Sequence, residues 1–219
     1  MRPDVIRALI REFLGAGSPD PIRARMSNVP EEALAIGESQ MYWSGGYGEA
    51  IRKHLARIGY RVTHESRPGY DATRVLGLFN ELYVPGKFSL VFTTIGGNHS
   101  TPEETVSAIR TIHNKIVKQD GGYLIAVSPP LRTIPEDPEK RRPSDDLPKQ
   151  RIEDTASNIN RFEVAAAVNM LDLPNTLTYG VAQSWPKFQD QPDGTHCEIG
   201  CDEIAADILE QARIKGIPV

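Results

Sequence analysis

The feature that most constrains the fold of this chain is the alternation of short strand-like segments with longer helical periodicities. Residues 89–95 and 123–127 are continuous runs of apolar and β-branched residues, which is typical of strands covered on both faces. Around them, apolar residues recur at helical spacing over segments of roughly 10 to 20 residues. Strands that alternate with helices of this length imply βαβ crossovers, and therefore a parallel sheet with helices on both faces.

We expect five strands, with helices following them along the chain. The expected strands cover residues 34–36, 61–64, 89–95, 123–127 and 176–179, and the expected helices cover 48–58, 71–79, 100–119, 152–171 and 198–214. Asp71 is placed to cap one helix, and Pro102 followed by two acids is typical of the first turn of another. This order predicts an α/β fold of three layers around a mostly parallel sheet.

Two stretches fall outside this alternation. Residues 1–30 are interpreted as an amphipathic helix over 4–14 and a lead-in with Gly and Pro, while residues 31–219 form the domain that holds every expected strand. Residues 128–150 contain six prolines and no periodicity. That composition favours a solvated surface loop, and a lid over a site or an assembly contact are the alternatives.

The composition excludes several classes of protein. A chain of 219 residues with 39% hydrophobic and 25% charged residues is ordinary for one globular domain, not for a disordered chain. Its apolar runs are far shorter than the roughly 20 residues of a membrane-spanning helix. A net charge of −4 does not favour a nucleic-acid surface. Charges within the first helix are unlike a secretory signal peptide, so we expect a cytoplasmic protein, or one otherwise without such a signal.

The cysteines are Cys197 and Cys201. On a helix, this spacing would hold their Cβ atoms farther apart than disulfide geometry prefers, so we expect two free thiols, which fits a reducing compartment. A zinc site needs three or four ligands, and no further Cys or paired His lies at a suitable spacing. We therefore expect neither a metal nor another cofactor.

Polar loops follow the expected strands at the edge where open parallel sheets bind their ligands. Residues 37–39 (Gly-Glu-Ser) follow the first strand, 66–70 the second and 96–99 (Gly-Gly-Asn-His) the third, while 193–196 (Asp-Gly-Thr-His) precede the last helix. These loops together supply a hydroxyl nucleophile, a base, a carboxylate and hydrogen-bond donors.

The residue types in these loops suit nucleophilic catalysis. A serine such as Ser39 is a weak nucleophile at neutral pH unless an adjacent base takes its proton. His196 can be that base, because an imidazole titrates near neutrality. Asp193 precedes it by three residues and can accept the other ring N–H, which would fix the tautomer.

The first and third of these loops resemble sequence blocks of the SGNH (GDSL-type) hydrolases. Residues 37–39 match the Gly-Asp-Ser block, with Glu38 in place of Asp, and we expect Glu38 to keep a support role behind the nucleophile. Residues 96–99 match Gly-x-Asn-Asp, with His99 in place of the last Asp. His99 either hydrogen-bonds locally in place of that Asp or lies near the substrate.

Two further blocks of the family are matched in the same order. Gly69 corresponds to the glycine of the second block, and residues 193–196 match the Asp-x-x-His block. The resemblance covers about residues 32–214. It implies a flavodoxin-like three-layer α/β/α fold and the activity of a serine esterase or acyl hydrolase.

The resemblance also implies a role for each matched residue. Ser39 would be the nucleophile, His196 the base and Asp193 the residue that orients it. The oxyanion hole would consist of the backbone N–H groups of Ser39 and Gly69 and the side-chain amide of Asn98. We expect glycine at position 69 because a side chain there would obstruct the approach of the backbone.

The implied reaction is hydrolysis of a carboxylic ester through an acyl-enzyme. The breadth of the family suggests a short acyl group, such as acetyl on a carbohydrate, so the partner would be a small-molecule or carbohydrate ester and not a nucleic acid or a membrane. Tyr70, His99 and Trp185 are the candidate substrate contacts. The alternative is a catalytically drifted binding or structural component of a larger assembly, which the departures at Glu38 and His99 would fit.

Overall fold

The centre of the fold is a parallel sheet. The computed structural model describes residues 31–128, 130–131, 148–184, 196 and 200–219. Within these residues the sheet has five strands: β1 (Glu32–Gly37), β2 (Arg61–Ser66), β3 (Leu90–Thr94), β4 (Tyr123–Ser128) and β5 (Thr176–Gly180). Their spatial order is β2-β1-β3-β4-β5 and every neighbouring pair is parallel. This is the flavodoxin-like order, and it confirms the predicted fold class.

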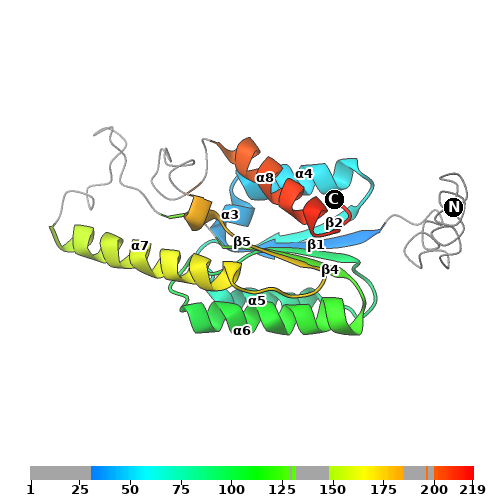
Figure 1. Cartoon of the computed structure of the whole chain (residues 1–219), viewed down its shortest axis with the longest axis horizontal. Helices are drawn as coiled ribbons and strands as arrows, with labels where there is room; N and C mark the ends of the chain where they lie inside the picture. Colours follow the sequence, from blue (N-terminus) through cyan, green and yellow to red (C-terminus); the bar gives the residue numbers. More distant parts are fainter. Residues whose placement is uncertain (1–30, 129, 132–147, 185–195, 197–199) are drawn as a thin grey trace, which may run out of the picture. The chain divides into compact units, whose positions relative to one another are not determined.

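Helices cover both faces of this sheet. The described helices are α3 (Ser39–Tyr42), α4 (Tyr47–Arg57), α5 (Ala72–Leu82), α6 (Pro102–His113), α7 (Pro148–Asn169) and α8 (Cys201–Ile214), with a π-helical turn η1 (Asn114–Gln119) and a 3-10 turn η4 (Val181–Ser184). Figure 1 shows α4 and α8 on one face of the sheet and α5 and α6 on the other.

The side chains of each strand alternate between two cores. On β1, Ala33 and Ala35 pack with the α4 and α8 side, whereas Leu34 and Ile36 pack with the α5 and α6 side, and all four are fully buried. A strand covered on both faces consists mainly of apolar and β-branched residues, which explains the continuous runs of these residues in the sequence.

Two helices that begin beside the candidate site are capped by side chains, and the cap at Asp71 is the one that the sequence predicts. Asp71 accepts a hydrogen bond from the backbone N–H of Arg74 at 2.9 Å and so caps α5. Thr101 and Glu104 form a reciprocal capping box at the start of α6, with distances of 2.9 and 3.2 Å. Each such cap stabilises its helix by about 1 kcal/mol. The caps fix where the loops after β2 and β3 end.

Glycine at the end of β1 is required by a close approach of the neighbouring strand. A Cβ on Gly37 would lie 2.2 Å from the Oγ1 atom of Thr94, on β3, and 3.0 Å from the Cβ of Met41. Only a residue without a side chain fits between them. The backbone that leads into Glu38 and Ser39 is therefore pressed against the sheet.

The two stretches that fall outside the strand-and-helix alternation can be compared with the structure only in part. The helix expected over 4–14, like all of residues 1–30, lies outside the described residues. Most of the Pro-rich loop also lies outside them, but its expected bounds of 128–150 are wrong at both ends. Ser128 belongs to β4, and α7 already begins at Pro148, because proline suits the first turn of a helix. None of the helices in the described ranges has the length and apolar character needed to cross a membrane.

The prediction of two free thiols is wrong for Cys201, which is disulfide-bonded. That prediction requires both cysteines to lie on one helix, but α8 begins at Cys201 and is preceded by Gly200 at φ +72°. Helical spacing between the two cysteines therefore does not apply. Cys197 itself lies outside the described residues.

Candidate active site

Ser39 is the first residue of a short helix. The sequence had suggested that it lies in a loop. It begins α3 directly after Glu38, which is the N-cap residue. Its side chain is almost buried, with 9% of the residue exposed. A backbone N–H at this position has no partner within the helix. The site thus combines a nearly enclosed hydroxyl with a backbone donor of the same residue.

The Glu38 carboxylate is the centre of the polar contacts around Ser39. Glu38 is only 2% exposed, and its Oε2 atom accepts hydrogen bonds from Ser39 Oγ at 3.0 Å and from Asn98 Nδ2 at 3.1 Å. Its Oε1 atom has no hydrogen-bond partner in the described part of the chain. One oxygen atom therefore joins the residue after β1 to the loop after β3.

Charges near Glu38 moderate the effect of its burial. Burial raises the pKa of the Glu38 carboxyl above its ordinary value. The Ser39 hydrogen bond and, after it, the electrostatic effects of Arg161 and His196 oppose that rise in pKa. Burial, and then the charge of Glu38, raise the pKa of the fully buried Tyr47 hydroxyl far above its ordinary value. Arg161, His196 and Tyr47 therefore all lie within electrostatic reach of this carboxylate.

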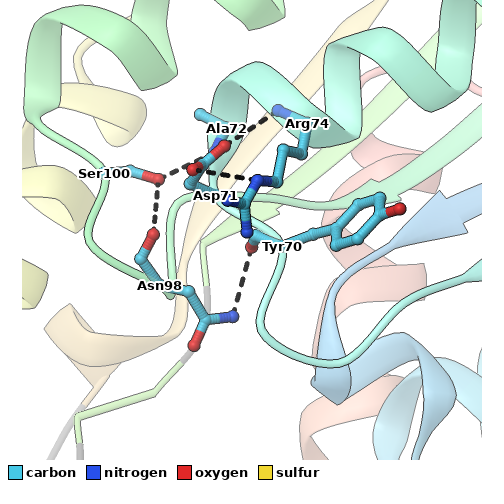
Figure 2. A network of polar contacts seen from close by, with 6 residues as sticks. All are labelled: Tyr70, Asp71, Ala72, Arg74, Asn98 and Ser100. Atoms are coloured by element: carbon cyan, nitrogen blue, oxygen red, sulfur yellow. Dashed lines mark hydrogen bonds and ion pairs between the residues drawn. The ribbon is translucent and has the colours of Figure 1, made fainter.

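The Asn98 side-chain amide is held on two sides. Besides its bond to Glu38, Nδ2 donates to the backbone carbonyl of Tyr70 at 3.2 Å, as Figure 2 shows. The Ser100 hydroxyl donates to the Asn98 carbonyl at 3.3 Å and accepts from the Ala72 N–H at 2.8 Å. The loops after β2 and β3 are thus tied together, and both hydrogens of the Asn98 amide are engaged.

Two consecutive residues of α7 hold the backbone on either side of Asn98. Arg161 Nε donates to the Gly97 carbonyl at 3.3 Å, and Asn160 Nδ2 donates to the Ser100 carbonyl at 2.9 Å. Arg161 is only 9% exposed. These contacts fix the path of the loop independently of the Asn98 side chain.

Arg161 and Asn160 are site residues that the sequence reasoning missed. A signal for Arg161 was present in the helical pattern, because it precedes Val164 and Val168 by three and seven residues. Those valines are fully buried, so a charged residue in register with them belongs to the inward face of the helix. A buried arginine at such a position needs an acidic or carbonyl partner.

Gly69 has a backbone conformation that favours glycine, and its expected approach to an oxyanion stays a prediction. Its φ is +79°, and no described atom would lie within 4 Å of an added Cβ. Within the protein a side chain would therefore meet no obstruction, and the left-handed backbone accounts for glycine here. No described hydrogen bond uses the Gly69 N–H.

His196 is the described member of the expected pair of base and orienting acid. Its imidazole stacks on the indole of Trp43, with ring centroids 4.4 Å apart. Asp193 and Trp185 lie outside the described residues. The arrangement of Ser39, His196 and Asp193 as a triad therefore stays a prediction.

His99 has an exposed side chain and a backbone φ of +52°, which is uncommon for a residue other than glycine. Both roles considered for it stay predictions. No group of three or more His, Cys, Asp or Glu side chains that could hold a metal occurs among the described residues. What the described groups offer is a hydroxyl, an imidazole, a buried carboxylate and amide donors at one edge of the sheet.

Comparison with solved structures shows that this chain has a known fold. An aryl esterase from M. smegmatis, in an inhibitor-bound form, matches with a TM-score of 0.56 and 14% identity over 84% of this chain and 99% of its own. A carbohydrate acetylesterase family member from Sinorhizobium meliloti matches with a TM-score of 0.55 and 15% identity over 84% and 98% of the two chains. A GDSL-like lipase from Bacteroides thetaiotaomicron matches with a TM-score of 0.51 and 14% identity over 96% of this chain and 98% of its own.

No protein-family profile and no curated protein matches the sequence. The resemblance to the SGNH (GDSL-type) hydrolases is confirmed at the level of the fold, since the chain has the three-layer architecture of these ester hydrolases. Identities this low show the fold alone, and one fold can carry many functions.

Proposed function

We propose that this chain is a serine hydrolase that cleaves a carboxylic ester through an acyl-enzyme. The observation that carries the proposal is the meeting of the Ser39 hydroxyl and the Asn98 amide on one oxygen of Glu38, at 3.0 and 3.1 Å. It brings a candidate nucleophile and a candidate oxyanion donor together from the ends of two neighbouring strands. The ester-hydrolase fold supports the same activity.

In the proposed reaction, Ser39 Oγ attacks the ester carbonyl carbon while His196 takes the hydroxyl proton. Collapse of the tetrahedral intermediate breaks the bond to the alcohol, which leaves with the proton from His196. Water, activated by the same imidazole, then releases the acid and restores Ser39. Asp193 would orient the imidazole.

The negative oxygen of the intermediate would accept hydrogen bonds from the N–H groups of Ser39 and Gly69 and from Asn98. Loss of one such donor typically costs about 2.7–4 kcal/mol of transition-state stabilisation. Because both hydrogens of the Asn98 amide are engaged, one must turn to the oxyanion during the reaction. The longer bond, to the carbonyl of Tyr70 at 3.2 Å, is the one we expect to be exchanged.

The proposed substrate is an ester with a short acyl group, such as acetyl on a carbohydrate. The names of the structural neighbours, which include a carbohydrate acetylesterase and an aryl esterase, support this class. Tyr70, His99 and Trp185 are the proposed substrate contacts. A panel of aryl esters of increasing chain length and acetylated sugars would test it, and a preference for long acyl chains would contradict it.

A fluorophosphonate probe together with p-nitrophenyl acetate tests the activity itself. The parent should be labelled and should turn the ester over, whereas Ser39→Ala should do neither. Ser107→Ala, at an exposed position of α6, is the matched control and should behave as the parent. A folded parent that is neither labelled nor active would overturn the proposal.

One observation favours a second candidate, a catalytically drifted binding or structural component. In the structure the Ser39 hydroxyl donates to Glu38, which stands where the family has Asp. If Glu38 held that proton permanently, Ser39 would not react. An unlabelled parent, with the same result for Glu38→Asp, is the outcome that would favour this candidate over the enzyme.

A further inference from the structure

A single carboxylate oxygen joins the candidate nucleophile to the candidate oxyanion donor. We propose that Glu38 is a positioning residue that acts through Asn98, by holding one hydrogen of its amide so that the other can reach the oxyanion. This role rests on the proposed function. It goes beyond a general support role, because it assigns one atom, Oε2, and one partner.

The contacts of Asn98 separate its side chain from its backbone. Arg161 and Asn160 hold the carbonyls of Gly97 and Ser100, so the loop on either side of Asn98 keeps its path without Glu38. The orientation of the amide depends instead on two acceptors, Glu38 Oε2 and the Tyr70 carbonyl. Loss of Glu38 should therefore release the amide and leave the loop in place.

Of these two acceptors, Glu38 is the stronger anchor. A hydrogen bond to a carboxylate is about twice as strong as one between neutral groups, and the Glu38 bond is the shorter, at 3.1 against 3.2 Å. When an oxyanion competes for the amide, the neutral carbonyl of Tyr70 should be displaced first. The amide hydrogen that is bonded to Glu38 stays in place and fixes the direction of the other amide hydrogen of Asn98.

The surroundings of Glu38 suit a permanent anchor. Glu38 is 2% exposed, so water seldom competes with Asn98 for its carboxylate oxygens. The positive charge of Arg161 partly compensates for the burial of the carboxylate. The helix α7, which carries this arginine, also holds Gly97, so the acceptor and the loop it serves share one support.

A double-mutant cycle tests the proposal, with p-nitrophenyl acetate as the substrate. Glu38→Ala and Asn98→Ala should each lower kcat by about 100-fold, with KM changed by less than about threefold. If Glu38 acts through Asn98, the double variant should lose no more than Asn98→Ala alone. Glu103→Gln, which removes an exposed carboxylate from the first turn of α6, is the control and should keep the parent kcat.

A conservative variant separates positioning from folding. Glu38→Gln keeps an oxygen that can accept from Asn98, so its kcat should lie within about tenfold of the parent. Glu38→Met fills a similar space without an acceptor and should repeat the loss of Glu38→Ala. It also replaces Glu38→Ala in the cycle if that variant does not fold, as judged by Tm.

Two results would overturn the role of Glu38: parent-like kcat in a folded Glu38→Ala or Glu38→Met, or losses that multiply in the double variant. These differ from failure of the proposed function. If the parent itself shows no probe labelling and no turnover, the esterase proposal fails. If the parent is active and the losses multiply, only the role of Glu38 fails.

Discussion

The indole ring of Trp43 lies parallel to the imidazole of His196, with 3° between the ring planes. Trp43 is the C-cap residue of α3, and Ser39 is the first residue of that helix. The short helix that carries the candidate nucleophile therefore also carries the ring that supports the candidate base. A cation over an indole face is attracted by the ring quadrupole, so this stack favours the imidazolium that forms during proton transfer.

Replacement of Trp43 should weaken catalysis more when the new side chain is aliphatic than when it is aromatic. Trp43→Leu should lower kcat/KM by about 2- to 30-fold, whereas Trp43→Phe should keep most of the activity. Tyr42→Leu, at an exposed neighbouring aromatic, is the control. Equal losses in Trp43→Phe and Trp43→Leu would show that the stack contributes by shape alone.

Removal of the Glu38 charge should change stability in a way that depends on pH. Burial raises the pKa of Glu38 above 4.5 in the folded chain, so the folded state takes up this proton more readily than the unfolded state. The stability that protonation contributes is therefore full below about pH 4.5, and it is lost as pH rises through the folded pKa.

Glu38→Gln lacks this titration. Its free energy of unfolding, relative to that of the parent, should therefore be larger at about pH 8 than at about pH 4.5, which means that its relative stability rises with pH. Urea denaturation of both proteins at the two pH values measures the difference. A relative stability that stays constant, or that falls as pH rises, would contradict the raised pKa.

Glycines with different surroundings should respond differently to alanine. Gly69→Ala meets no atom but must adopt φ +79°, which should cost about 1–2 kcal/mol of unfolding free energy. Gly77→Ala, within α5 and also without close neighbours, should instead stabilise by about 0.5–1 kcal/mol. Thermal unfolding compares the two, and equal effects would mean that the backbone at Gly69 is not constrained.

Reduction should destabilise the chain through the disulfide of Cys201. A disulfide typically contributes about 2–4 kcal/mol, so a reducing agent should lower the Tm of the parent. Cys201→Ser should have the lower Tm before reduction and no further response to it. Detection of reactive thiols in the unreduced, denatured parent in the amount of two per chain would show that no disulfide forms.

The central strands of the sheet were open to prediction from sequence because they are buried on both faces. Such strands seldom carry charge, so Leu90–Thr94 stands out as a continuous run of apolar and β-branched residues. The cap at Asp71 and the helix start marked by Pro102 and its two acids were equally visible, because the first turn of a helix favours particular side chains at fixed positions. Local chemistry thus determined both the strands and the starts of these helices.

The contacts of the candidate site were less visible because they join residues far apart in the chain. Four residues, Ser39–Tyr42, are too few to show a helical period, so α3 was read as a loop. Arg161 was passed over because a charge on a helix is normally assigned to solvent. Its contact with Gly97 spans 64 positions, and only the folded chain brings the two together.

The close approach of Thr94 makes position 37 intolerant of any side chain. A Cβ on Gly37 would lie 2.2 Å from Thr94 Oγ1 and also 2.9 Å from the Thr94 backbone carbonyl oxygen, so a smaller residue at position 94 would not make room for it. Distant relatives should therefore keep this glycine whatever residue stands opposite. It offers a way to recognise members of the lineage after the residues around Ser39 have diverged.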